Sequence, residues 1–234
     1  IQLEKSTIIS SSSGPLGKIF HYGSIRLEDA SSRVLLDLPD IPRPKKHLKI
    51  ITDWIRTSDQ KISEKPDISK ILSEEEHEEL EFKSSFRFDV QNHKINHDLE
   101  KAAMKTVAAL LNSNGGHLVI GVNDSREPIG IENDYNALGR KNSDCFENHF
   151  TQIFNKMIGP EFRHFITLWF HKEEKDREIC VVRVLPSARP VYLRCDNDEH
   201  FYIRTGNIST PLKLSEAEFY SRARWPERFI DITL

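Results

Sequence analysis

The sequence lacks what several familiar protein classes require. Its 234 residues contain three cysteines, Cys145, Cys180 and Cys195, and none of them stands in a C-x-x-C pair. This spacing argues against a zinc knuckle and a disulfide framework, and it favours a reducing compartment such as the cytoplasm. No apolar run approaches the roughly 18 residues of a membrane-spanning helix, so no membrane partner is expected. The chain begins with Ile1 rather than Met, which is expected of a fragment.

Common catalytic motifs are absent as well. There is no G-x-x-x-x-G-K-[ST] loop for nucleotide phosphates, no G-x-S-x-G turn for a serine nucleophile and no H-E-x-x-H zinc helix. The formal net charge is -3, which argues against a strongly basic nucleic-acid coat protein. A local basic patch could still bind phosphates on a chain of this charge.

The chain changes character near residue 70. Before that point, Ser10–Ser13 predicts a turn-rich stretch, and His47–Arg56 has apolar residues at helical spacing. A polar stretch around Pro66 is typical of a linker. We therefore predict an N-terminal extension over residues 1–70, a domain over residues 71–226 and a C-terminal tail over residues 227–234.

The predicted domain mixes helix and strand patterns. Ser73 and Glu76 have the spacing of a capping box that opens a short helix, and Gly130–Asn142 predicts a polar loop. Two further helices are expected over Leu99–Leu111 and Phe146–Met157, and the first ends at Asn114-Gly115-Gly116. A last helix is expected to open with a capping box at Ser215 and Glu218. The predicted strands are Leu118–Val122, His164–His171, Ile179–Leu185, Val191–Leu193 and Phe201–Arg204. This order predicts an α/β fold, a mixed sheet with flanking helices.

Three acids carry the first functional hypothesis. Glu76 and Glu81 precede the long helix, and Asp124 follows the buried strand. Convergent carboxylates are the ligands that a hard divalent cation such as Mg²⁺ or Mn²⁺ prefers, and such a cation can activate water beside a phosphate. The alternative is a solvated acidic surface, because Glu76 and Glu81 belong to one acidic run.

Polar and basic residues near element ends carry the second hypothesis. Lys83 lies two residues after Glu81, on the same side of an extended strand, and suits a phosphate contact. The other predicted nucleic-acid contacts are Arg140, Lys141, Arg204 and Asn207. Each of them could instead be an ordinary surface side chain.

These motifs together resemble the Schlafen-type AlbA_2 domain over about Glu75 to Pro226. The resemblance is carried by Glu81-Phe82-Lys83, by the run Ala108–Asp124, by Gly130-Ile131 and by Phe201–Asn207. In Schlafen ribonucleases, two glutamates and one aspartate form a metal-dependent site that cuts tRNA or rRNA. The resemblance therefore implies that Glu76, Glu81 and Asp124 hold Mg²⁺ or Mn²⁺ and are catalytic together with Lys83.

The chain departs from the family pattern in three respects. Asn123 stands where many relatives carry Asp, and the cysteine and histidine zinc motif of long Schlafens is absent. Long Schlafens also pair two lobes, whereas this chain has one clear core, so a homodimer could restore that geometry.

The sequence predicts a metal-dependent endoribonuclease for structured RNA, tRNA foremost, with DNA as another partner. The alternative is a non-catalytic nucleic-acid-binding module of a bacterial regulatory or defence protein. A purely structural or oligomerisation domain is the third reading.

Overall fold

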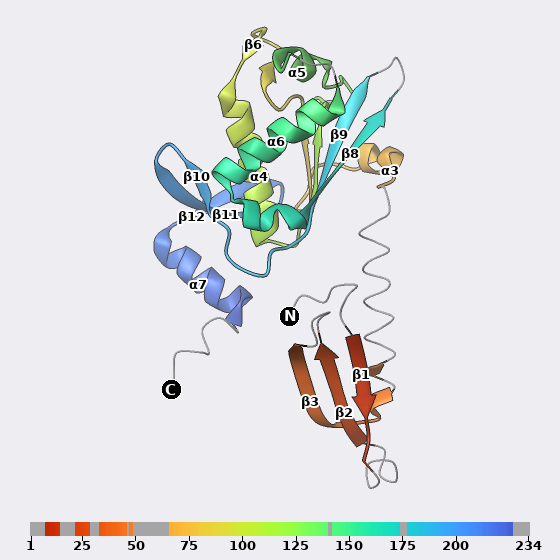
Figure 1. The fold of residues 1–234 in the computed structure, drawn as a ribbon. Coiled ribbons are helices and arrows are strands. Elements are labelled where there is room, and N and C mark those ends of the chain that lie inside the picture. Colours follow the sequence, from red (N-terminus) through yellow and green to blue (C-terminus); the bar gives the residue numbers. More distant parts are fainter. Residues whose placement is uncertain are drawn as a thin grey trace. The chain divides into compact units, whose positions relative to one another are not determined.

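The computed structural model describes residues 8–14, 22–28, 33–45, 47–48, 66–139, 142–173 and 177–226. Contacts between Cα atoms divide the chain into two units, Ile1–Pro66 and Asp67–Leu234, and each is described by itself (Figure 1). The apolar pattern places the boundary slightly later, after residue 70.

The described part of the first unit contains a three-stranded antiparallel sheet in the order β1-β2-β3. Ile25 and Leu27 are buried, and Arg26 between them pairs with Asp37 of the neighbouring strand. The turn predicted at Ser10–Ser13 is wrong, because every residue of the first strand pairs with the second. The helix predicted over His47–Arg56 lies outside the described residues apart from its first two. The strands are β1 (Ile8–Ser12), β2 (Tyr22–Glu28) and β3 (Val34–Pro42).

The second unit is built on a four-stranded sheet in the order β4-β7-β9-β8. The strands are β4 (Leu80–Lys83), β7 (Gly116–Ile120), β8 (Ile166–Lys172) and β9 (Glu178–Val184). β4 runs parallel to β7, and the other neighbouring pairs are antiparallel. The hairpin of β8 and β9 is the one predicted from the sequence. With the helices on its faces, this sheet confirms the predicted mixed α/β fold (Figure 1).

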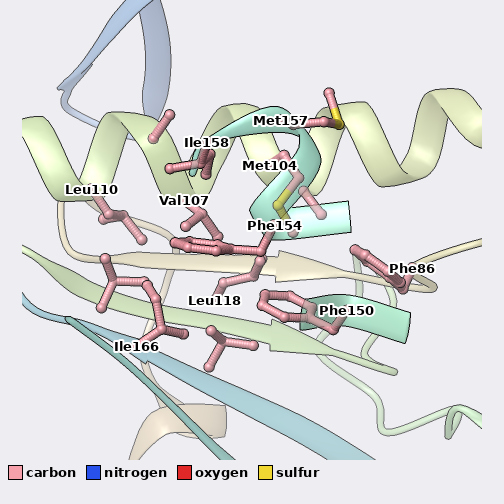
Figure 2. Close-up of a cluster of buried hydrophobic side chains, with 14 of the residues drawn as sticks. Phe86, Met104, Val107, Leu110, Leu118, Phe150, Phe154, Met157, Ile158 and Ile166 are labelled. Atoms are coloured by element: carbon pink, nitrogen blue, oxygen red, sulfur yellow. The ribbon is translucent and has the colours of Figure 1, made fainter. Parts of the chain in front are cut away.

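Helices cover both faces of this sheet because successive strand residues point to opposite sides. Leu118 belongs to the large core with Phe150 and Phe154, whereas its neighbour Val119 belongs to a smaller core with Ile71. Figure 2 shows the large core gathered between helices and sheet. The helices are α3 (Ile68–Ser73), α4 (His97–Asn112), α5 (Glu132–Ala137), α6 (Ser143–Met157) and α7 (Leu214–Arg224), with a 3-10 helix η1 at Pro160–Phe165.

Three local predictions need correction. α3 ends at Ser73 instead of starting there, because Asp67 caps its N-terminus by accepting the backbone N–H of Lys70 at 3.2 Å. The region predicted as a polar loop contains α5. The capping box of α7 lies two residues earlier than expected, at Lys213 and Glu216, since the carboxylate of Glu216 accepts the backbone N–H of Lys213 at 2.8 Å.

Glu100, in the first turn of α4, is a buried carboxylate that is 3% exposed. It accepts hydrogen bonds from Arg87 at 2.7 Å, from His97 at 2.9 Å and from His149 at 2.6 Å. Burial alone would raise the pKa of Glu100, but the hydrogen bonds from His149, His97 and Arg87 outweigh it and lower the pKa to about 2. The cluster therefore joins α4, α6 and the segment that contains Arg87 through one charge.

Asp134 on α5 is a second buried carboxylate, 1% exposed. Its oxygens accept the hydroxyl of Ser85 and the backbone N–H groups of Phe86, Arg87 and Phe88 at 2.7–3.1 Å. Burial raises the pKa of Asp134 despite these bonds. The short helix thus holds the segment that follows β4. That segment leads into a two-stranded ribbon of β5 (Phe88–Asp89) and β6 (Lys94–Ile95).

A further sheet in the order β10-β11-β12 packs against α4. Its strands are β10 (Leu193–Cys195), β11 (Asp198–Thr205) and β12 (Ile208–Leu212). Asn112, the last residue of α4, is fully buried and donates to the carbonyl oxygens of Val191 at 2.8 Å and Tyr202 at 2.9 Å. The amide side chain therefore fastens this sheet to the end of the helix. None of the helices in the described ranges is both long and apolar enough to span a membrane.

Candidate functional site

The residues Glu74–Glu79, called the acidic segment below, connect α3 to β4. The backbone N–H of His117 donates to the carbonyl oxygen of Glu79 at 2.7 Å and fixes the end of this segment against β7. Gly116 permits the approach: its φ is +137°, and a Cβ there would lie 2.1 Å from the carbonyl oxygen of Glu79. Gly116 therefore allows β7 to approach the backbone of the acidic segment closely.

Glu76 extends from the acidic segment toward the free edge of β4. Its Oε1 atom accepts the backbone N–H of Phe82 at 2.9 Å. Because β4 is an edge strand, this bond satisfies a donor that no neighbouring strand covers. Glu76 is exposed, so its other oxygen remains accessible to a ligand.

Three of the predicted site residues line one pocket of about 370 Å³, called the carboxylate pocket below. They are Glu76 from the acidic segment, Asp124 from the turn after β7 and Asn207 from the turn between β11 and β12. The fold thus brings together residues that are far apart in the sequence. The remaining lining residues are Glu75, Phe82, Asn123 and Arg126.

Asn123 builds the turn that carries Asp124. Its side chain donates to the carboxylate of Glu127 and accepts the backbone N–H of Glu127, both at 2.9 Å. Asn123 therefore has a local structural role. Asp124 is exposed, and no hydrogen bond to its carboxylate is found within the described part of the chain.

The other predicted acid, Glu81, is 8% exposed and lies in a network of charges. Its Oε1 atom accepts a hydrogen bond from the ammonium of Lys83, and its Oε2 atom accepts one from Arg204 at 2.8 Å. The side chain of Arg204 is 0% exposed, whereas that of Lys83 is 28% exposed. Arg204 therefore does not face solvent, where a nucleic-acid contact was expected. Lys83 does reach solvent.

Of the three predicted metal ligands, Glu76 and Asp124 line the carboxylate pocket, and Glu81 does not. Glu76 and Asp124 have oxygen donors at the pocket, as Mg²⁺ or Mn²⁺ would require. Both oxygens of Glu81 are bonded to cations. Within the described ranges, no group of three or more His, Cys, Asp or Glu side chains is placed to hold one metal ion.

Two of the predicted contacts cannot be placed, and two residues near the pocket were not predicted. Arg140 and Lys141 lie outside the described residues. Arg126 was missed, although it lies two residues after the predicted Asp124 and lines the same pocket. Its Nη1 atom lies 3.5 Å from the carbonyl oxygen of Glu74, so it reaches the start of the acidic segment. Ser113, also missed, accepts the backbone N–H of Arg204 at 2.8 Å.

Comparison with known proteins identifies the domain. A family model described as Schlafen, AlbA_2 matches residues 76–213. No match is found among curated proteins. The DIP2311 protein of Corynebacterium diphtheriae, whose crystal structure is known, is 17% identical, with a TM-score of 0.46; the match covers 67% of this chain and 31% of that protein. Since the family model spans more than half of the sequence, the chain belongs to the Schlafen AlbA_2 family.

Proposed function

We propose that this chain binds RNA at the carboxylate pocket and cuts its phosphodiester backbone as an endoribonuclease, with tRNA as the first substrate to test. Family membership indicates a nucleic-acid-related function. The observation that carries the finer proposal is the shared pocket of Glu76, Asp124, Arg126 and Asn207. It combines proton acceptors with groups that can bind a phosphate backbone.

Each of these residues has a distinct part in the proposal. Glu76 and Asp124 are the catalytic residues, because exposed carboxylates can accept the proton of an attacking hydroxyl or water. Arg126 and Asn207 hold the RNA backbone from the pocket wall. Lys83 contacts a phosphate from the neighbouring network, because its ammonium is part-exposed and Glu81 orients it.

Dependence on a divalent cation, Mg²⁺ or Mn²⁺, belongs to the proposal as well. Glu75, Glu76 and Asp124 contribute three carboxylates to the pocket lining, against a single guanidinium from Arg126. This excess of negative charge would repel an incoming phosphate unless a cation reduced it. Glu76 and Asp124 are the residues that would bind such a cation.

A second candidate function is nucleic-acid binding without cleavage. The observation that favours it is the ion-pair network at Glu81, in which Lys83 and Arg204 occupy both carboxylate oxygens. In that case RNA or DNA affinity falls steeply with salt concentration, and substitution of the acids has little effect on binding.

The homodimer stays a prediction that light scattering of the chain with and without RNA can test.

A cleavage assay on matched variants tests both candidates. The chain is incubated with total tRNA, and with a DNA of similar length, in Mg²⁺, Mn²⁺ or EDTA. We compare it with the Glu76→Gln and Asp124→Asn variants, and with Glu218→Gln as a control on the exposed surface of α7. Each pocket variant should cut RNA at least roughly 100-fold more slowly, since it loses a proton acceptor, and the control should cut normally.

Binding measured in parallel distinguishes the outcomes. Fluorescence anisotropy at several salt concentrations reports RNA affinity independently of cutting. RNA fragments that require the cation and disappear in both pocket variants support the endoribonuclease. Normal cleavage by a folded Glu76→Gln, Asp124→Asn double variant contradicts the assigned residues. Salt-sensitive binding with no cleavage by the original chain supports the binding module instead.

A further inference from the structure

Arg204 on β11 donates four hydrogen bonds from a side chain that is fully shielded from solvent. Its guanidinium donates to the carbonyl oxygens of His77 at 2.8 Å and Glu78 at 3.2 Å. It also donates to the carboxylate of Glu81 at 2.8 Å and to the hydroxyl of Ser209 at 3.2 Å. Three of these four acceptors belong to the acidic segment or to the strand that follows it.

The position of these acceptors ties Arg204 to the carboxylate pocket. His77 and Glu78 directly follow Glu76, and Glu81 directly precedes Phe82, whose backbone N–H is bonded to Glu76. The guanidinium of Arg204 therefore holds the backbone that follows Glu76. It also holds β4, the strand to which the carboxylate of Glu76 is bonded. Arg204 is itself fixed at the C-terminal end of α4, because the C-cap residue Ser113 accepts its backbone N–H.

We propose that Arg204 is the positioning residue of the carboxylate pocket, fixing the acidic segment and Glu81 together so that Glu76 faces Asp124. The effect of Arg204 on catalysis rests on the proposed function. The claim that Arg204 fixes the acidic segment does not. Arginine is required because a planar fork of five N–H donors can reach acceptors on several sides at once. A lysine ammonium on a flexible stem cannot bond all four acceptors in this arrangement.

Hydrogen exchange, measured peptide by peptide, tests the structural part. We compare the original chain with Arg204→Met, Arg204→Lys and a control, Arg222→Met, which alters an exposed ion pair on α7. Residues 74–82 should exchange at least roughly tenfold faster in Arg204→Met, with a smaller increase in Arg204→Lys. Exchange in the middle of α4 and in the control variant should stay unchanged.

A double variant keeps the test decisive where Arg204→Met folds poorly. Arg204→Met leaves the Glu81 carboxylate buried without Arg204, so the Arg204→Met, Glu81→Gln double variant removes that charge. Its unfolding midpoint should recover toward that of the original chain. Residues 74–82 should still exchange fast, because the carbonyl oxygens of His77 and Glu78 lose their bonds to the guanidinium of Arg204 in both variants. Unchanged exchange there, or a uniform increase across the whole domain, overturns the proposal.

Kinetics tests the catalytic part separately. In the tRNA assay, Arg204→Lys should lower kcat at least roughly tenfold and leave the Kd for RNA unchanged, because the residue positions the pocket without touching the substrate. A normal kcat in Arg204→Lys overturns this part. If the original chain cuts no RNA, the proposed function fails, and the exchange experiment still decides whether Arg204 positions the acidic segment.

Discussion

Replacing Glu100 with Gln removes the charge on which Arg87, His97 and His149 converge, with little change in side-chain shape. The pKa of Glu100 is about 2 in the fold, against an ordinary value of 4.5. A tenfold change in proton affinity corresponds to about 1.4 kcal/mol, so the ionised carboxylate contributes about 3 kcal/mol to the free energy of unfolding. Because the pKa is lowered, this contribution is complete above about pH 4.5 and is lost as the pH falls toward 2.

Urea denaturation of the original chain and of Glu100→Gln, followed by tryptophan fluorescence, measures this contribution. The two free energies of unfolding should differ by about 3 kcal/mol near pH 7 and by about 1 kcal/mol near pH 3. Glu218→Gln serves as the control, because its exposed ion pair contributes at most about 0.5 kcal/mol. A difference that is the same at both pH values would refute the reasoning, since it would show that the charge is not the origin of the stability.

Two further substitutions test how the backbone is held. Gly116→Ala places a Cβ 2.1 Å from the carbonyl oxygen of Glu79, so it should destabilise the domain by at least about 2 kcal/mol in urea denaturation and loosen the acidic segment in hydrogen exchange. A normal midpoint would show that the segment can shift freely. Asp134→Asn replaces an acceptor oxygen with an N–H₂ group facing backbone donors, and should cost about 1–3 kcal/mol by the same measurement. Full stability would show that the amide finds other partners.

Helices and strands whose apolar residues recur at regular spacing were predictable from the sequence. α4, α6 and the hairpin of β8 and β9 have apolar residues at the spacing of one buried face, and the structure has all of them. α5 was missed because six residues are too short for a periodic signal, and its buried Asp134 depends on donors in a distant segment. β1 was missed because its serines are ordered by pairing with β2, which local composition does not report.

The candidate site was predictable where its residues stand near the ends of strands. Glu76, Asp124 and Asn207 each stand near the end of a strand, and they line one pocket. Arg204 has the same local signal, an arginine near the end of a strand, yet it is buried. Its partners Glu78 and His77 lie 126 and 127 positions earlier in the chain, so no local pattern could distinguish this arginine from a surface one.

This separation in sequence has a consequence for synthesis on the ribosome. Chains elongate at about 5–20 residues per second, so Arg204 emerges roughly 6 to 25 seconds after His77, its partner 127 positions earlier. Throughout that interval the nascent chain carries the acidic segment without the guanidinium that donates to the carbonyl oxygens of His77 and Glu78. A product released early, before β11, would have every carboxylate of the pocket but neither Arg204 nor Asn207.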